Sequence, residues 1–230
     1  MKFLALLAVV GIVNSIDVPI FPNKYEAKFH EKSSLGIVSG ETNGQIYIDA
    51  DNNQQLITRE DGRADRYCGT VFKLQHTRCN HYVVNNKRYL DFPDKKYCCF
   101  CCDSDHGCGI VKPDWLAKAG ATYNGSETLP GDSQPSQKWY IKGIFLKNVG
   151  GQDNYYYHKD DSLKTPRRLY QVPEDTIDYT SYYVGIQNPH VFDLPSYCTD
   201  KCGATTICAA LRGDESQLTS ENDEEVVELE

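Results

Sequence analysis

Ten cysteines in a chain of 230 residues constrain this protein more than any other feature of its sequence. An even number allows complete pairing into five disulfides, although the sequence alone does not say which cysteines are partners. Each bridge that closes a loop of tens of residues is expected to stabilise the fold by ~3–4 kcal/mol. The cysteines fall into an early pair, a dense central block and a late group: Cys68 and Cys79; Cys98, Cys99, Cys101, Cys102 and Cys108; Cys198, Cys202 and Cys208.

Adjacent cysteines do not easily bridge each other, so the central block is expected to reach distant cysteines, both the early pair and the late group. The block also contains two overlapping C-x-x-C pairs, Cys98 with Cys101 and Cys99 with Cys102, which are typical of redox sites and of half zinc sites. Neither has its usual context, because we find no strand–helix–strand pattern around them and no second ligand pair at zinc spacing. Structural disulfides are therefore favoured.

The N-terminus predicts a secreted protein. Met1 and Lys2 carry positive charge, and the apolar run that follows, Phe3 to Val13, is too short for a bilayer span of ~20 residues. Small or neutral side chains precede Ser15, so residues 1–15 are expected to be a signal peptide; the alternative is a buried N-terminal strand or helix. The expected location is outside the cell or in the lumen of the secretory pathway. No second long apolar stretch follows, so we expect no membrane-spanning segment.

Charge and composition narrow the class further. A formal net charge of −8 argues against a nucleic-acid binder, which needs a basic face. Sixteen tyrosines favour β-sheet, where aromatic side chains pack well. Residues 213–230 are acidic with no apolar periodicity and are expected to be a disordered tail. What remains, 16–212, has the size of one domain.

Alternating residues and turn clusters predict a series of antiparallel strands. One short helix is expected after Pro113, and a loop over 122–137, which contains the sequon at Asn124, the expected glycosylation site if the protein is glycosylated. The expected fold is mainly β: a curved antiparallel sheet with one or two short helices, held by disulfides. The strands are predicted at 25–31, 45–50, 55–59, 70–74, 81–84, 87–92, 138–145, 154–158, 168–172 and 177–186.

Several motifs resemble those of secreted ependymin-related proteins. They include the run Cys-Cys-Phe-Cys-Cys at 98–102, Pro-Asp-Trp-Leu at 113–116, the three tyrosines at 155–157 and Phe-Asp-Leu-Pro-Ser-Tyr-Cys at 192–198. The resemblance covers about residues 40–202. It implies a half-barrel like that of LolA-type lipoprotein carriers, which wraps a short helical plug and a hydrophobic pocket. It also implies a lipid or other apolar ligand, and it allows calcium binding.

A single curved sheet must cover its concave face with a helix, a second sheet or a ligand. The short helix would cover only part of that face, so an apolar pocket is expected there. Each aromatic residue on the face is also a candidate for ordinary core packing. The predicted lining is Tyr47, Phe72, Tyr82, Trp115, Tyr140, Phe145, Tyr156, Leu169 and Tyr183.

The sequence gives little support to the hypotheses that the protein is an enzyme or binds a metal. The common catalytic motifs are absent, and a dyad of Cys101 or Cys102 with His106 would need a free thiol. Asp103, Asp105, Asp160 and Asp161 offer oxygen ligands for calcium without the spacing of an EF-hand, so the metal site is unknown. We therefore expect a non-enzymatic binder of a lipid or other hydrophobic molecule without a cofactor. The alternatives are a calcium-dependent adhesion or structural protein with protein partners or a homodimer, and a thiol or redox enzyme.

Overall fold

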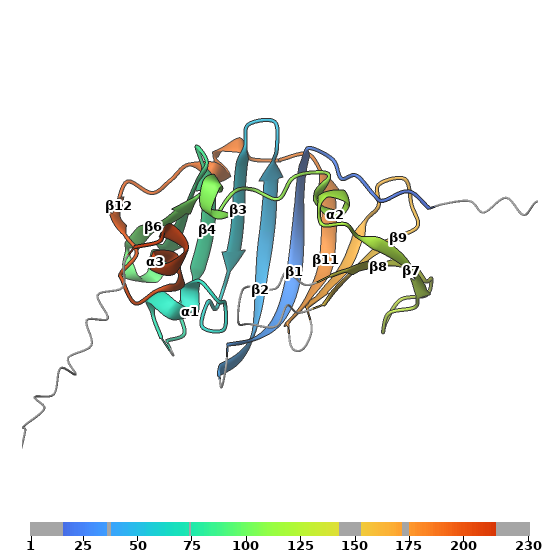
Figure 1. The fold of residues 1–230 in the computed structure, drawn as a ribbon, viewed down its shortest axis with the longest axis horizontal. Helices are drawn as coiled ribbons and strands as arrows, with labels where there is room; N and C mark the ends of the chain where they lie inside the picture. The colour runs from blue at the N-terminus through green and yellow to red at the C-terminus, as the bar shows by residue number, and fades with distance from the viewer. Residues whose placement is uncertain (1–15, 36–37, 74, 143–152, 172–174, 215–230) are drawn as a thin grey trace, which may run out of the picture.

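The computed structural model of the chain describes residues 16–35, 38–73, 75–142, 153–171 and 175–214. These residues form one large curved sheet of twelve strands with three short α-helices (Figure 1). The sheet order is β12-β6-β5-β4-β3-β2-β1-β11-β10-β9-β8-β7, and every neighbouring pair is antiparallel except β12 with β6. The predicted fold class, a mainly β protein with a curved antiparallel sheet, is confirmed. The expected signal peptide and nearly all of the expected tail lie outside the described residues.

The strands are β1 Lys24–Leu35, β2 Val38–Asp49, β3 Gln54–Arg59, β4 Cys79–Val84, β5 Lys87–Phe92, β6 Tyr97–Asp103, β7 Thr122–Glu127, β8 Ser136–Ile141, β9 Asn154–Lys159, β10 Pro166–Gln171, β11 Asp175–Val184 and β12 Cys198–Lys201. The helices are α1 Cys68–Val71, α2 Trp115–Lys118 and α3 Ile207–Arg212, with single 3-10 turns η1 Pro93–Lys95, η2 Ser104–His106 and η3 Pro189–Phe192.

The two faces of the sheet differ in what covers them. We call the face that carries α1, α2 and α3 the inner face, and the opposite one the outer face (Figure 1). Because side chains alternate along a strand, Ile46 and Ile48 of β2 point to the inner face and Tyr47 to the outer one. On the outer face, the segment that links β11 to β12 lays Phe192 against Leu56 and Tyr82.

Disulfides hold one end of the sheet. Three bridges join neighbouring residues of β6 to the C-terminal region: Cys98–Cys198, Cys99–Cys202 and Cys101–Cys208. The expected link between the middle of the chain and its end is therefore present. The expectation that the block also reaches the early pair is wrong, because Cys68 bonds to Cys79 and Cys102 to Cys108.

Three local predictions differ from the structure. Residues 70–74 were expected to form a strand, but α1 occupies Cys68–Val71, and Cys68 and Gly69 are buried. The predicted loop at 122–137 begins with strand β7, which pairs with β8 although most of its side chains are exposed. The described residues carry three helices rather than one or two; two of them, α1 and α3, contain the disulfide cysteines Cys68 and Cys208.

Candidate functional site

An apolar pocket lies on the inner face, where α2 crosses the sheet. Its volume is about 140 Å³. The walls come from six strands, from α2, and from the segments that precede α2 and β1. Residues far apart in sequence therefore meet here. The lining residues are Phe21, Tyr25, Ile46, Ile48, Ile57, Val111, Trp115, Tyr156, Pro166, Leu169, Tyr179 and Tyr182. All of them are apolar or aromatic, which is the usual character of a pocket for a hydrophobic ligand.

Helix α2 and the N-terminal segment form the cover of the pocket. The Trp115 ring packs edge-on against Tyr156 at 5.5 Å, and Phe21 packs edge-on against the same ring, also at 5.5 Å. The backbone N–H of Phe21 donates to the carbonyl of Pro113 at 3.0 Å, which ties the two covering segments together. An α-helix of four residues is not stable alone, so these aromatic contacts hold it in place.

Side-chain hydrogen bonds hold the segment leading to α2 on the sheet. The backbone N–H of Val111 donates to Oε1 of Gln55 at 2.8 Å, and Gln55 is itself buried on β3. Val111 is 39% exposed although it lines the pocket. It therefore marks the place where the pocket meets solvent.

A β-bulge brings two tyrosines of β11 into the pocket. The register between β1 and β11 shifts between Lys28 and Phe29, so that Lys28 pairs with Ser181 and Phe29 with Tyr179. An extra residue in one strand reverses the alternation of faces at that point. Tyr179 and Tyr182, three residues apart, consequently both face inward.

The hydroxyl of Tyr182 is the one buried side-chain oxygen among the described residues that has no hydrogen-bond partner. Leaving a buried hydroxyl unpaired costs about 1–3 kcal/mol, which a ligand with an acceptor atom would recover. Burial raises the pKa of Tyr182 to about 12, so the phenol keeps its proton at neutral pH. Burial raises the pKa values of Tyr25, Tyr156 and Tyr179 as well. The pocket thus offers neutral hydroxyls rather than charges.

A buried ionic cluster separates the pocket from the disulfide end. Nε of Arg59 donates to Glu31 at 2.5 Å, and its NH1 lies 3.4 Å from Asp65. His81 Nε2 lies 3.1 Å from the same Asp65. Burial alone would raise the pKa of Asp65, but His81 and Arg59 hold it well below its usual range. This cluster fills the inner face between the two apolar regions, so the pocket does not extend toward the disulfides.

The structure does not bring the nine predicted lining residues together. Trp115, Tyr156 and Leu169 line the pocket. Tyr47, Tyr82, Tyr140 and Tyr183 project from the outer face, because they alternate with inward-facing neighbours on their strands. Phe72 packs on the disulfide core against Phe92, and Phe145 lies outside the described residues. Whether any of these residues contacts a ligand remains a prediction.

Nine of the twelve residues that line the pocket are not among those predicted from the sequence. On β2 the run Ile46-Tyr47-Ile48 has an apolar side chain on both faces: the two isoleucines line the pocket, and Tyr47 lies on the outer face. The alternation Tyr25-Ala27-Phe29 did indicate one shared face, and this is the inner face. The roles of Phe21 and Val111 depend on how loops cross the sheet, which no local pattern indicates.

The cysteines leave no thiol for chemistry among the described residues, where none is free. A nucleophilic dyad with His106 needs such a thiol, and both Cys101 and Cys102 are bonded. The two groups of potential metal ligands that come together in the described part are Cys68, Cys79 and His81, and Cys101, Cys102 and Cys108. Their sulfurs are all in disulfides and are therefore poor metal ligands. Calcium binding and glycosylation of Asn124, an exposed residue of β7, remain predictions.

No family model and no curated protein matches the chain. Solved structures that resemble it include an uncharacterized conserved protein from Thermus thermophilus, with 7% identity, a TM-score of 0.47 and coverage of 78% of this chain and 90% of the other. A chain of the Pseudomonas aeruginosa MucA/MucB complex matches with 9% identity and a TM-score of 0.43, over 77% of this chain and 57% of its own length. A LolA superfamily protein from Nitrosomonas europaea matches with 8% identity and a TM-score of 0.38, over 76% of this chain and 92% of its own length. At these values the similarities assign neither a family nor a function, and the resemblance to ependymin-related proteins stays a prediction.

None of the helices in the described ranges has the length and apolar character needed to cross a membrane. Five disulfides are typical of proteins that fold in an oxidising compartment outside the cytoplasm.

Proposed function

We propose that this protein is a secreted, non-enzymatic carrier that holds a lipid or another hydrophobic molecule in the inner-face pocket. The observation that carries the proposal is the pocket itself, a cavity lined by apolar and aromatic side chains with one unpartnered buried hydroxyl. A void of this kind loses packing contacts and persists more readily when a ligand supplies them.

The size of the pocket limits what enters it. An engineered apolar cavity of about 150 Å³ binds benzene, whereas pockets for drug-sized molecules measure about 300–1,000 Å³. A cavity of about 140 Å³ therefore accepts one ring or a short length of acyl chain. The rest of a longer ligand would leave the pocket beside Val111, where the wall meets solvent.

In this proposal the polar end of the ligand carries a hydrogen-bond acceptor. The Tyr182 hydroxyl is protonated and unpaired, so it donates to a carbonyl, ester or carboxyl oxygen. An amphiphile with an apolar chain and an oxygen head satisfies both features of the site. Medium-chain fatty acids are the simplest members of this class and serve as the probe.

The test uses the full secreted chain purified without detergent. Native mass spectrometry looks for a copurified apolar molecule, and calorimetric titration measures the binding of decanoate. We expect one bound molecule per chain. The absence of both a copurified molecule and decanoate binding overturns the proposal.

One variant assigns the binding to the pocket. Val111→Trp fills the mouth without altering the core, and we expect it to weaken decanoate binding at least tenfold. Leu163→Trp, a change of another exposed apolar residue outside the lining, is the matched control and should leave binding unchanged. Equal loss in both variants, or loss in neither, would show that decanoate binds elsewhere.

A further inference from the structure

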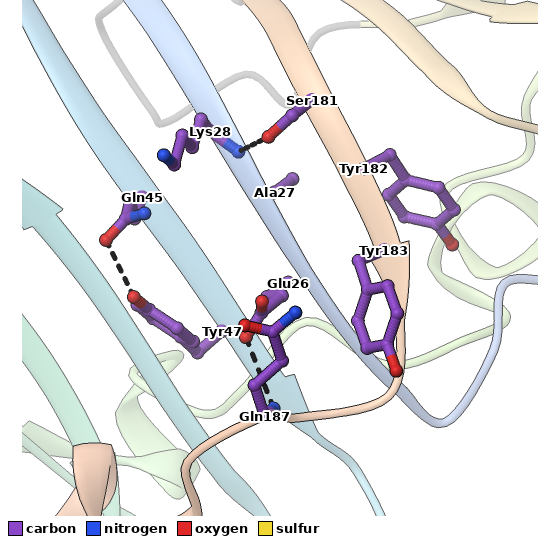
Figure 2. Close-up of a pocket in the computed structure, with 9 residues that line it drawn as sticks. All are labelled: Glu26, Ala27, Lys28, Gln45, Tyr47, Ser181, Tyr182, Tyr183 and Gln187. Carbon is purple, nitrogen blue, oxygen red and sulfur yellow. Dashed lines mark hydrogen bonds between the residues drawn. The ribbon is translucent and has the colours of Figure 1, made fainter.

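A second cavity lies on the outer face, on the other side of the sheet from the apolar pocket. Its volume is about 240 Å³, and its side chains come from the three central strands β2, β1 and β11 and from the segment that follows β11 (Figure 2). In contrast to the inner pocket, this groove contains charged and amide groups. The residues around it are Glu26, Ala27, Lys28, Gln45, Tyr47, Ser181, Tyr182, Tyr183 and Gln187.

Two rows of side chains cross the groove from strand to strand. In the first row, Glu26 of β1 pairs in register with Tyr47 of β2 on one side and with Tyr183 of β11 on the other. In the second row, Lys28 of β1 lies between Gln45 and Ser181 in the same way. Residues two apart on a strand share a face and lie about 7 Å apart. The groove therefore has an acidic aromatic row beside a basic polar row.

The first row is suited to a bulky organic cation. Tyr47 and Tyr183 lie two strand spacings apart, about 9.6 Å, with the Glu26 carboxylate between them. Aromatic faces on either side of a carboxylate attract quaternary ammonium groups through cation–π interactions. Tyr183 is 52% exposed, so its ring is accessible to a ligand. Burial, together with the Glu26 charge, raises the pKa of Tyr47.

The second row is suited to an anion. The Ser181 hydroxyl oxygen accepts the backbone N–H of Lys28 at 3.3 Å, which leaves its own proton available. Oε1 of Gln45 accepts from the Tyr47 hydroxyl at 2.7 Å, so the amide NH₂ of Gln45 remains a donor (Figure 2). With the Lys28 ammonium, the row presents three kinds of donor and no carboxylate.

The two charged side chains of the groove, Glu26 and Lys28, are available to a ligand. Within the described part of the chain, neither Glu26 nor Lys28 forms an ion pair, although most other nearby charges do. The carboxylate accepts one long hydrogen bond, from the backbone N–H of Gln187 at 3.5 Å. A ligand that carries both a cation and an anion would pair with each of them at once.

We propose that this groove binds a phosphocholine group, with its trimethylammonium between Tyr47, Tyr183 and Glu26 and its phosphate on Lys28, Ser181 and Gln45. The site lies on the opposite face of the sheet from the inner pocket and shares only Tyr182 with it. Free phosphocholine and the headgroup of phosphatidylcholine share this chemistry, and the experiment distinguishes them.

The first arm is calorimetric titration of the full secreted chain with phosphocholine, choline and phosphoethanolamine. We expect one site that prefers phosphocholine, because choline lacks the anion and phosphoethanolamine lacks the bulky cation. Tyr183→Leu and Glu26→Gln should each weaken phosphocholine binding at least fivefold, whereas Lys28→Gln should weaken phosphocholine but not choline. Tyr123→Leu, which changes another exposed tyrosine on the distant strand β7, is the matched control. Circular dichroism confirms that each variant is folded.

The second arm is flotation with phosphatidylcholine vesicles. Vesicle binding that Tyr183→Leu abolishes assigns the lipid headgroup as the source, and binding of soluble phosphocholine alone assigns the free compound. Absence of binding in both arms overturns the proposal. Binding that Tyr183→Leu, Glu26→Gln and Lys28→Gln all leave unchanged overturns it as well. Because decanoate binding is measured separately, failure of this site is distinguishable from failure of the carrier function.

Discussion

The indole Nε1 of Trp139 donates a hydrogen bond to Nε2 of His158 at 3.0 Å, between the neighbouring strands β8 and β9. The other ring nitrogen of His158, Nδ1, lies 2.6 Å from the carbonyl oxygen of Lys159. A ring that accepts at Nε2 and donates at Nδ1 is neutral and in a single tautomer. Both side chains are 1% exposed, so protonation of the ring would break the bond to Trp139 inside the sheet.

From the hydrogen bond between Trp139 and His158 we expect acid to destabilise the fold at a pH above that at which most carboxylates titrate. Burial lowers the pKa of His158 below 6.5, so the unfolded chain takes up a proton first as the pH falls. The stabilising contribution of the neutral ring is complete above about pH 7 and is lost progressively below about pH 6.5. Urea unfolding at pH 7.5, 6.5 and 5.5 should show this loss. His158→Gln should make the fall shallower, while His106→Gln, at an exposed histidine, should not; equal slopes in all three proteins would contradict the assignment.

The buried ion pair of Glu31 and Arg59 gives a second prediction. Arg59→Met leaves Glu31 buried without its cation and leaves Asp65 with His81 alone, and removing one partner of a buried pair costs about 3–5 kcal/mol. The free energy of unfolding from urea titration measures the loss. Lys32→Met, which breaks the exposed pair with Glu41, is the control and should change stability by less than about 1 kcal/mol. A loss as small as that of the control would show that the cluster contributes little.

The fold class was predictable from local patterns, whereas the pocket was not. Alternation in segments such as 25–31 and the turn at 51–53 indicate antiparallel strands directly. The pocket depends on long-range events: the crossing of 109–114 over the sheet, the packing of Phe21 on Trp115, and the bulge that turns both Tyr179 and Tyr182 inward. A bulge changes which face a residue occupies without leaving a mark in the sequence. The residues expected to line one pocket were therefore divided between two faces.

Gly44 gives a third prediction, because two strands approach each other closely there. A Cβ at this position would overlap the carbonyl oxygen of Thr58 and the ring of Phe29. Overpacking of this kind costs about 1–3 kcal/mol or more, so Gly44→Ala should lower the unfolding midpoint in urea. Gly203→Ala is the matched control, since nothing lies within 4 Å of its Cβ position. Equal midpoints for the two variants would contradict the close approach of β1, β2 and β3.

The Tyr182 hydroxyl gives a fourth prediction, which concerns ligand chemistry and rests on the proposed function. Tyr182→Phe removes a buried group that lacks a protein partner, so the free protein should lose no stability. Decanoate binding should weaken by about five- to tenfold, the value of one hydrogen bond. Binding of decane, which has no acceptor, should be unchanged. Equal weakening of both ligands would show that the hydroxyl acts only through packing.

The three bridges from β6 to the C-terminal region should stabilise the fold in a non-additive way. With Cys99–Cys202 in place, Cys98–Cys198 closes an additional loop of only about five residues, which is worth ~2 kcal/mol in the chain-entropy model. When only one of the three bridges is left, it closes a loop of about a hundred residues, which is worth ~4–5 kcal/mol in the same model.

Replacing the cysteines of any one of these bridges by alanine should therefore cost about 2 kcal/mol. Removing all three should exceed the sum of the single losses by about 2–3 kcal/mol, as measured by urea unfolding. The short Cys102–Cys108 bridge lies outside this nested set, so its removal should add independently to any single loss. Strict additivity among the three β6 bridges would mean that each stabilises the folded state through its own contacts rather than by closing a shared loop.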